Sequence, residues 1–339
     1  GGTSAFFTVE IGLTPQNPNA SGTLAATSAT SYVSAGATGI NTEDGGSAIN
    51  NRQSFVGLKK NGAGTFTIGT QYTPAFQALS ATDVGQTNNM PGSAVYPQTM
   101  AGSNGNPGAK PFATVGGPGG ATDGITVRTS NTVNAQSDKF AGFSANAMWT
   151  LANQNASSVA NGSGQITSGG NTNASGWGLG ADYTLNKFYV AAAYQALKQL
   201  TVANTDVSPW TNAQAAGATG VGGTSGGALV STTNTQLVGY ASNVQDNQFY
   251  AGATYDFGIL KAYAQYVNRK VTSAISSNYY AKRQAEQIGV RSFITPTIEA
   301  WASAGLGRYT AFGPGNSAVN FNGWQLGSNY YLSKRTNLY

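Results

Sequence analysis

The feature that most constrains this chain is a strict alternation of hydrophobic with small or polar residues, repeated in segments of about ten residues. In 177–185 every odd position carries Trp, Leu, Ala or Tyr, whereas every even position carries Gly, Asp or Thr. In 249–257 the odd positions carry only Phe, Ala and Tyr. Because successive side chains of a strand point to opposite faces, the pattern predicts strands with one apolar and one small polar face. We therefore expect an all-β fold.

The same alternation predicts thirteen strands, the last of them cut short. They cover residues 5–12, 52–59, 64–72, 125–134, 141–151, 177–185, 187–198, 246–257, 260–270, 284–294, 297–308, 321–332 and 336–339. The connections alternate in length, because every second one is only a few residues long and the others are much longer. Short turns at one end and long loops at the other are typical of a transmembrane antiparallel up-and-down β-barrel. The tracts 101–120 and 155–175, rich in Gly, Ser, Thr and Asn, predict loops.

The composition favours a membrane protein of the β type. Only 9% of the 339 residues are charged and 40% are hydrophobic, which is unusual for a soluble surface. No stretch approaches the roughly 18 uninterrupted apolar residues of a membrane helix. Aromatic residues near strand ends are candidates for the girdles at the two membrane interfaces. These candidates are Tyr183, Phe188, Tyr255, Phe257, Trp301, Trp324 and Tyr330.

The absence of Cys and His excludes most catalytic and metal-binding chemistry. The sequence also has no Gly-x-Ser-x-Gly elbow and no phosphate-binding loop. We therefore expect that the protein is not an enzyme and that it binds neither a cofactor nor a metal. Glu43 and Asp44 are a candidate for holding a divalent cation, although an ordinary turn is favoured. The net charge of +5 is spread over single Lys and Arg residues, which argues against nucleic-acid binding.

A sheet that spans hydrocarbon must close on itself, because an unpaired backbone group is costly there. Bacterial single-chain barrels use an even number of strands, whereas the alternation predicts thirteen. We therefore expect further strands at both ends of the given chain.

Three segments resemble the trimeric general-diffusion porins of Gram-negative bacteria, most closely the β-proteobacterial type. They are Arg-Gln-Ser-Phe-Val-Gly-Leu-Lys at 52–59, Gly-Thr-Gln-Tyr-Thr-Pro-Ala-Phe at 69–76 and Tyr-Leu-Ser-Lys-Arg-Thr-Asn-Leu-Tyr at 331–339. The resemblance implies a sixteen-stranded barrel, of which residues 1–339 are a single domain that lacks the first two and the last strands. It also implies passive diffusion of ions and small hydrophilic solutes across the cell outer membrane. The implied partners are two further copies in a homotrimer, with Phe55 and 13–51 near a neighbouring subunit, and outer-membrane lipid and lipopolysaccharide.

The resemblance further implies that 73–124 is a loop folded into the pore, where it forms a constriction against a basic wall. Arg52 and Arg128 match basic-wall positions, and Asp83 and Glu10 match acidic ones. After Asp83 the loop lacks the further glutamate that many relatives carry, so the acidic side looks weakened. Other lumen-facing candidates, which follow from the alternation, are Lys261, Arg291, Tyr189, Tyr250 and Tyr263.

These positions favour a size-limited channel with a mild anion preference. Two alternatives remain open. One is a solute-selective porin in which the lumen tyrosines form a slide for one nutrient. The other is an outer-membrane adhesin or structural barrel without significant conductance.

Overall fold

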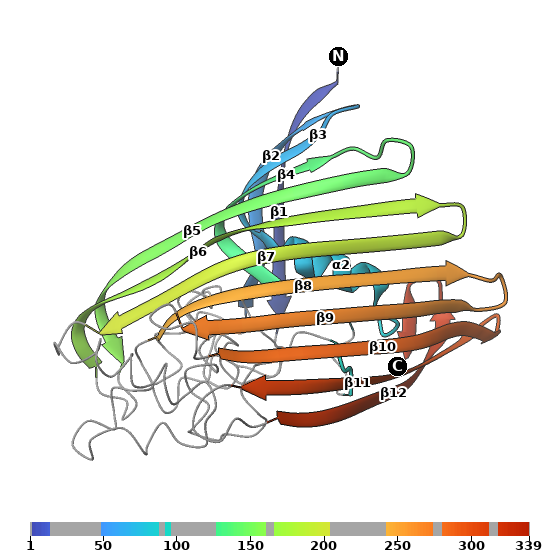
Figure 1. The fold of residues 1–339 in the computed structure, drawn as a ribbon. Coiled ribbons are helices and arrows are strands. Elements are labelled where there is room, and N and C mark those ends of the chain that lie inside the picture. The colour runs from blue at the N-terminus through green and yellow to red at the C-terminus, as the bar shows by residue number, and fades with distance from the viewer. Residues whose placement is uncertain are drawn as a thin grey trace.

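Thirteen antiparallel strands form a single curved sheet in which each strand pairs with the next one in the chain (Figure 1). This is seen in a computed structural model, which describes residues 2–13, 49–87, 92–95, 127–160, 166–203, 242–273, 280–311 and 318–338. Within these residues β1 and β13 are the two edges of the sheet. The predicted all-β, up-and-down arrangement is confirmed.

Each strand corresponds to one that the alternation predicts. They are β1 (Thr3–Leu13), β2 (Ile49–Lys60), β3 (Gly64–Tyr72), β4 (Arg128–Ser137), β5 (Phe143–Ala160), β6 (Ile166–Leu185), β7 (Phe188–Ala203), β8 (Ser242–Asp256), β9 (Lys261–Ser273), β10 (Tyr280–Thr295), β11 (Ile298–Ala311), β12 (Ala318–Ser333) and β13 (Thr336–Leu338).

The tract 155–175 was predicted to be a loop, and this is wrong for its described residues. β5 and β6 pair from Phe143 with Tyr183 as far as Ala160 with Ile166. Small polar residues weaken the period-two signal, but a backbone ladder between two adjacent segments does not depend on apolar side chains. The tract 101–120 and the pair Glu43 and Asp44 lie outside the described residues.

Short connections join neighbouring strands at one end of the sheet, which we call the turn end, and the opposite end the loop end (Figure 1). Two-residue connections join β6 to β7, β10 to β11 and β12 to β13, and the first of them is the pair Asn186 and Lys187. Asn186 adopts a positive φ of 52°, which Asn tolerates and which is typical of the commonest two-residue hairpin turns. Gly258, between β8 and β9, has a φ of 90°.

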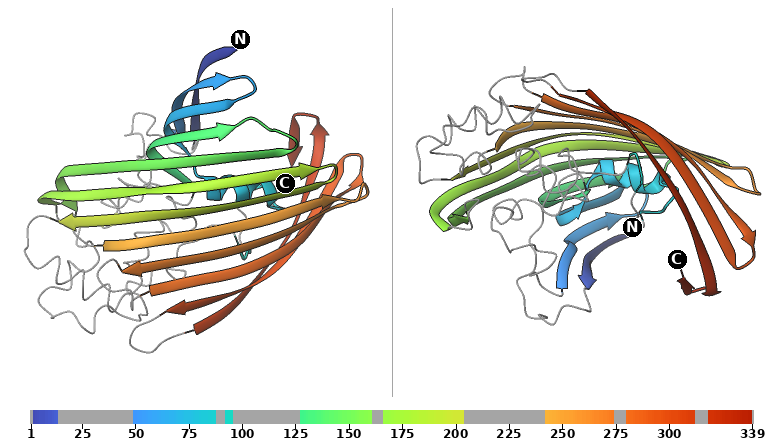
Figure 2. Two further views of the ribbon diagram at one scale, coloured as in Figure 1. Left: turned by 45° about the horizontal axis from the view of Figure 1, so that its top comes forward. Right: turned by 90° about the horizontal axis from the view of Figure 1, so that it is seen from below.

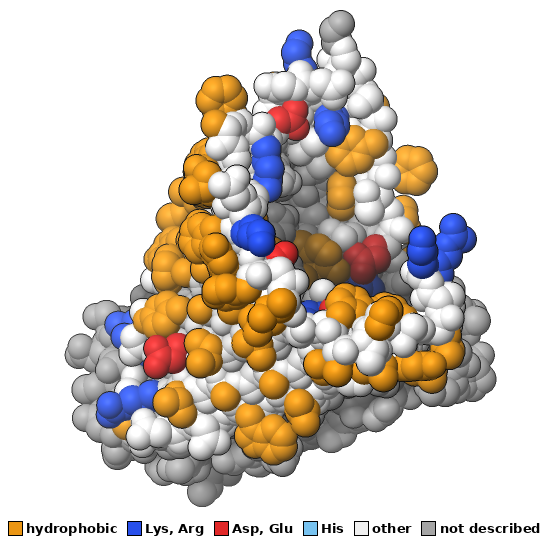
Figure 3. Space-filling model, turned by 90° about the vertical axis from the view of Figure 1, so that its right-hand side faces the viewer, with side chains coloured by type: hydrophobic (Ala, Val, Ile, Leu, Met, Phe, Trp, Pro, Cys, Tyr) orange, Lys and Arg blue, Asp and Glu red, His pale blue; other side chains and the backbone are white. Residues whose placement is uncertain are grey.

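The two faces of the sheet differ as the alternation predicts. Large apolar side chains point outward and are exposed, for example Phe7 at 75% and Trp324 at 72%. Viewed onto the turn end, these side chains cover the outer surface, whereas the interior is hollowed and carries charged groups (Figure 3). Six of the seven girdle candidates are exposed in this way. Trp301 is the exception, because it is 4% exposed and packs with Val84 and Tyr263 inside.

A helix, α2 (Pro74–Thr82), follows β3 directly and was not predicted. Thr73 caps it by accepting a hydrogen bond from the Phe76 backbone N–H at 3.1 Å, and Pro74 occupies the first turn. The helix lies on the concave side of the sheet (Figure 2) and contacts β5 to β9. Its apolar residues Phe76 and Leu79 belong to a buried cluster that includes Tyr250 and Val267. No helix among the described residues is long and apolar enough to cross a membrane.

Candidate pore lining and constriction

The helix α2 is tied to the inner face of the sheet by side chains from well-separated strands. Asn146 on β5 donates from Nδ2 to Gln77 Oε1 at 2.5 Å. Gln265 on β9 donates from Nε2 to the Leu79 carbonyl at 3.0 Å and to Thr82 Oγ1 at 3.2 Å. The middle of the helix is therefore held by β5 and its C-terminal end by β9.

Residues 83–95, so far as they are described, continue the same path along the wall. Arg291 on β10 donates from Nη1 to the Val84 carbonyl at 2.8 Å. Further on, the Ala94 N–H donates to Gln287 Oε1 at 2.8 Å, and Arg283 Nη2 donates to the Ala94 carbonyl. We call residues 74–87 and 92–95 together the inner segment.

Arg283 is almost fully buried, and its guanidinium is sandwiched between the inner segment and two aromatic rings. It lies 6.0 Å from the centre of the Tyr309 ring and 5.5 Å from that of Phe321. Such cation–π contacts become stronger when they are desolvated. Arg283 therefore serves to anchor the Ala94 backbone and is not a charge open to the pore.

Two glycines on the inner face allow the inner segment to approach the wall closely. A Cβ on Gly252 of β8 would collide with the hydroxyl of Thr82. A Cβ on Gly305 of β11 would lie 2.6 Å from Ala94 Cβ and 2.6 Å from the backbone oxygen of Glu286. Any side chain at these positions would push the inner segment away from the sheet.

Asp83 ends α2 and is only 5% exposed. Its Oδ2 accepts a hydrogen bond from the Thr87 N–H at 2.7 Å, which closes a turn within the inner segment. Burial raises the pKa of the Asp83 carboxyl above its ordinary value, against the opposing effect of its hydrogen bonds and of Arg291. The Asp83 carboxyl group thus makes its hydrogen bond within the inner segment and not with a solute in the pore.

Glu10, Arg52 and Arg128 come together on β1, β2 and β4. Arg52 Nε lies 2.6 Å from Glu10 Oε1, and the Tyr72 hydroxyl is 3.2 Å from both oxygens of Glu10. The guanidinium of Arg128 lies 5.8 Å from the Tyr72 ring centre. The side chains of Arg52 and Glu10 are 40% and 34% exposed, so the ion pair is open to solvent.

Arg291 forms a second ion pair across the sheet, and this one is buried. Its Nε and Nη2 each donate to one oxygen of Glu299 at 2.6 Å, in a bidentate arrangement. Asn329 and the Tyr331 hydroxyl donate to Glu299 Oε2 at 3.0 and 2.9 Å. The two side chains are only 6% and 9% exposed. With the bond to the Val84 carbonyl, this pair joins β10, β11, β12 and the inner segment.

The remaining candidate lumen residues lie on the same inner face but differ in how far they are exposed to the pore. Lys261 Nζ lies 5.3 Å from the ring centre of Tyr263, beside a hollow of about 560 Å³ that Gln86 also lines. Tyr250 and Tyr263 are 3% and 8% exposed, so they pack against neighbouring groups and do not stand free in the lumen. Tyr189 is half-buried near Lys139, whose Nζ lies 5.7 Å from the ring.

Sequence reasoning missed a third ion pair on the inner face. Arg269 on β9 and Asp246 on β8 are 2.6 Å apart, and both side chains are 2% exposed. Gln248 donates to Asp246 Oδ2 at 2.9 Å, and Gln195 donates to Gln248. The alternation that placed Tyr250 inside also places Asp246 inside, so the signal was present.

A sheet that is apolar outside, charged inside, and crossed on its inner face by a tethered segment defines an outer-membrane β-barrel channel. The chain belongs to the Gram-negative porin family, whose profile it matches over residues 1–339. It is accordingly a non-enzymatic passive diffusion channel of the outer membrane.

Solved porin structures are similar to this chain. OmpF of Salmonella typhi, solved in complex with daunomycin, has 15% identity and a TM-score of 0.50, covering 86% of this chain and 69% of that one. The anion-selective porin of Comamonas acidovorans has 13% identity and a TM-score of 0.40, covering 85% and 80%. OmpT of Vibrio cholerae, in a trimer form, has 13% identity and a TM-score of 0.39, covering 83% and 81%. A comparison with curated protein sequences finds no significant match.

Proposed function

We propose that the chain forms a size-limited aqueous pore whose constriction is the loop 73–124, with a mild preference for anions. The observation that carries this proposal is the tethering of the inner segment to β5, β9 and β10 by the side chains of Asn146, Gln265, Gln287 and Arg291. A segment bound at so many points across the inner face narrows the space that solutes have to cross. Size is then the main determinant of passage.

The charge preference is proposed to be mild because several lumen bases are paired with carboxylates. Arg52, Arg269 and Arg291 each have a carboxylate at 2.6 Å. Lys261 makes no ion pair with any acidic side chain in the described residues and lies beside the open hollow near Gln86. Opposite charges about 10 Å apart in water interact by only ~0.4 kcal/mol, and physiological salt screens them over ~8 Å. The formal charge of +5 gives the direction, and screening keeps the preference small.

The experiment is a planar bilayer measurement with the purified protein under a KCl gradient. We expect open channels and a zero-current potential that indicates a modest anion preference. Liposome swelling with neutral sugars of increasing size should show a gradual cut-off. A clear cation preference would contradict the charge proposal. Saturable block by one solute would favour the solute-selective alternative, and the absence of conductance would favour the adhesin or structural barrel.

We also propose that the protein is a homotrimer, which family membership supports. Phe55, expected near a neighbouring subunit, packs edge-to-face on Phe6 with ring centres 6.3 Å apart. Both lie on the face opposite to the exposed Phe7 and Val56, so the latter two are better candidates for a subunit contact. An unheated gel in detergent should show a band at three times the monomer mass that disappears on boiling.

A further inference from the structure

The hollow of about 560 Å³ lies at the turn end, between the inner segment and the short connection from β8 to β9. We call it the rim hollow. Its lining combines an acid, a base, an amide and aromatic rings, which belong to Asp256, Lys261, Gln86, Tyr263 and Phe293. Figure 3 shows the hollowed interior from this end, with charged side chains of both signs. Gln86, Asp256 and Phe293 are exposed, so the rim hollow is open to water.

The acid and the base of the rim hollow lie on adjacent strands. Asp256 on β8 and Lys261 on β9 are direct partners, and alternation places Lys261 on the inner face with Tyr263. Within the described residues they nevertheless form no ion pair. Lys261 Nζ lies 5.3 Å from the centre of the Tyr263 ring, and Asp256 Oδ1 accepts a hydrogen bond from the Gly258 N–H at 2.7 Å. An ammonium group and a carboxylate oxygen thus stand side by side, and both can bind a solute.

The other base of this rim is already engaged. Arg291 donates from Nε and Nη2 to Glu299, and from Nη1 to the Val84 carbonyl. An entering carboxylate therefore binds the Lys261 ammonium, which offers three donors. Gln86, at the turn within the inner segment, brings a side-chain amide to the same hollow.

A large apolar side chain stands on the water-facing side of the rim hollow. Phe293 follows Arg291 by two positions on β10, so it points inward, and it is 57% exposed. Its ring centre lies 5.8 Å from that of Tyr331, whose hydroxyl binds Glu299 on the inner face. Because Lys261 is the direct partner of Arg291, Phe293 is its diagonal neighbour, about 7–8 Å away. An apolar group that covers this ring removes apolar surface from water, which is favourable.

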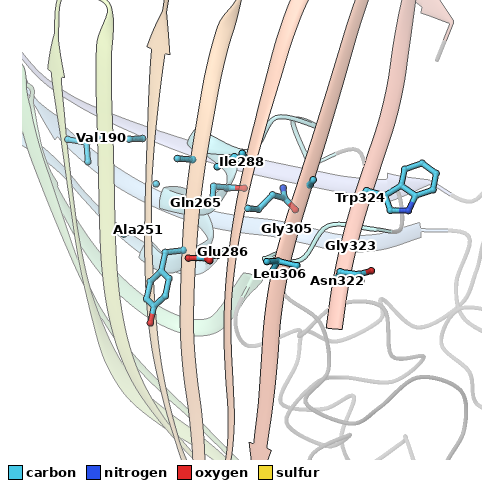
Figure 4. A pocket seen from close by; sticks show the side chains of 16 residues that line it. Val190, Ala251, Gln265, Glu286, Ile288, Gly305, Leu306, Asn322, Gly323 and Trp324 are labelled. Atoms are coloured by element: carbon cyan, nitrogen blue, oxygen red, sulfur yellow. The ribbon is translucent and has the colours of Figure 1, made fainter. Parts of the chain in front are cut away.

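A larger hollow, of about 740 Å³, differs from the rim hollow in its position. It lies on the outer face, where Ile288, Leu306 and Trp324 line it (Figure 4). These three side chains belong to the exposed apolar surface that faces lipid. A solute in the pore therefore meets the rim hollow and not the outer one.

We propose that the rim hollow binds an α-amino acid with an apolar side chain. The carboxylate of the amino acid lies on the Lys261 ammonium and the Gln86 amide. Its own ammonium group lies on Asp256, and its side chain covers the Phe293 ring. A simple anion is repelled by Asp256 and a simple cation by Lys261, whereas a zwitterion satisfies both. The rim hollow opens at the turn end, so this binding does not depend on the proposed passage of ions.

The test follows binding of L-phenylalanine to the purified protein in nonionic detergent by saturation-transfer difference NMR. We expect saturable binding that K261Q and D256N each weaken about tenfold, because each variant loses a charge-assisted hydrogen bond. The matched control is K187Q on the neighbouring turn, whose carbonyl accepts a hydrogen bond from the Asp256 N–H. Lys187 does not line the rim hollow, so the affinity of K187Q should stay within about twofold of the wild type. Wild-type affinity in both K261Q and D256N overturns the proposal.

Three smaller ligands separate the contributions of the amino acid's groups. Phenylacetate lacks the ammonium group, phenethylamine lacks the carboxylate, and glycine lacks the apolar side chain. Each should bind the wild type about tenfold more weakly than L-phenylalanine does. Phenylacetate binding as tightly as L-phenylalanine would make the rim hollow a simple anion site. Phenethylamine binding as tightly would make it a simple cation site, and either result refutes the proposal.

The variant F293A tests the apolar contact without changing any charge. Its affinity for L-phenylalanine should fall severalfold, while its affinity for glycine should stay within about twofold of the wild type. If the charge variants do not fold, F293A decides the question, and an unchanged preference for L-phenylalanine over glycine in that variant overturns the proposal.

Ion conductance in a planar bilayer checks that each variant is folded, and it separates this inference from the proposed pore. A wild-type protein that conducts ions but does not bind L-phenylalanine would refute the inference and leave the pore intact. A wild-type protein that binds L-phenylalanine without conducting would refute the proposed pore and support the rim hollow as a binding site.

Discussion

Two ion pairs on the inner face have the same chemistry but different surroundings. Arg52 with Glu10 and Arg291 with Glu299 each bring a guanidinium nitrogen within 2.6 Å of a carboxylate oxygen. The first pair is 40% and 34% exposed, whereas the second is 6% and 9% exposed and also holds the Val84 carbonyl. A pair in water contributes little to stability, and a buried pair that loses one partner is costly. The comparison teaches that a lumen-facing base can tune the pore or hold its parts together.

The largest expected effect is that of Arg291→Met. It leaves the Glu299 carboxylate buried without its cation and releases the Val84 carbonyl. We expect a loss of about 3–5 kcal/mol in the free energy of unfolding, measured by urea titration of the folded barrel in lipid. The double variant R291M/E299M should recover most of this loss, because no lone charge is left. If R291M were as stable as the wild type, the buried Arg291–Glu299 pair would not differ from the exposed Arg52–Glu10 pair in its contribution to stability.

Substitution in the wall beneath the inner segment should have the next largest effect. Gly252→Val places a side chain against Thr82, and overpacking of this kind costs about 1–3 kcal/mol. We also expect an altered conductance, since α2 has to move. The matched control is Ala253→Val, one residue away on the outer face. Equal conductance of both variants would mean that α2 does not limit the pore.

Arg52→Gln should change stability by less than about 1 kcal/mol, because its pair with Glu10 is solvent-exposed. It should instead shift the zero-current potential toward cations, and Glu10→Gln should shift it toward anions. Both shifts should shrink in 1 M KCl, where the Debye length is ~3 Å. Shifts of the same sign in the two variants would show that the pair does not face the ion path.

The smallest effect concerns Asp83. Since burial raises its pKa in the folded state, the stability that its neutral form provides is fully present below pH 3.8 and is lost as the pH rises through the folded value. Asp83→Asn stays neutral, so it should be slightly more stable than the wild type at pH 7. Urea titrations at both pH values should show this difference vanish below pH 3.8. If the difference in stability between the variant and the wild type persisted below pH 3.8, its cause would be a change in packing and not the charge of Asp83.

Most of the fold was predictable because the alternation is a local property. The sequence of each strand shows which of its side chains point to the apolar face and which to the polar face. Short turns then bring neighbouring strands of the chain together as pairs. β5 and β6 extended beyond their prediction because Gly, Ser and Asn obscure that alternation without preventing pairing. The cap of α2 could have been found from Thr73 followed by Pro74, which is a helix-start signal.

The candidate site was less predictable. The alternation placed Arg52, Arg291 and Tyr250 on the inner face, but it does not report exposure. Whether an inward residue meets water depends on the inner segment, whose contacts join residues about 70 to 200 positions apart in the chain, such as Gln77 with Asn146 and Ala94 with Gln287. No local pattern encodes such contacts. That is why the burial of Arg283 and Arg291 emerges only from the structure.

The contacts of the inner segment also determine the order in which parts of the barrel can assemble. Each strand pairs with its neighbours in the chain, so the sheet can grow one strand at a time in chain order. The inner segment follows β3, yet the side chains that hold Ala94 come from β10. During synthesis and insertion Ala94 has no β10 side chain to bind until seven further strands have arrived, whereas Gln77 in the same segment can already bind β5. Pulsed hydrogen exchange during refolding should therefore protect the Ala94 amide later than the amides of β2 and β3, so that the barrel wall forms before its constriction settles.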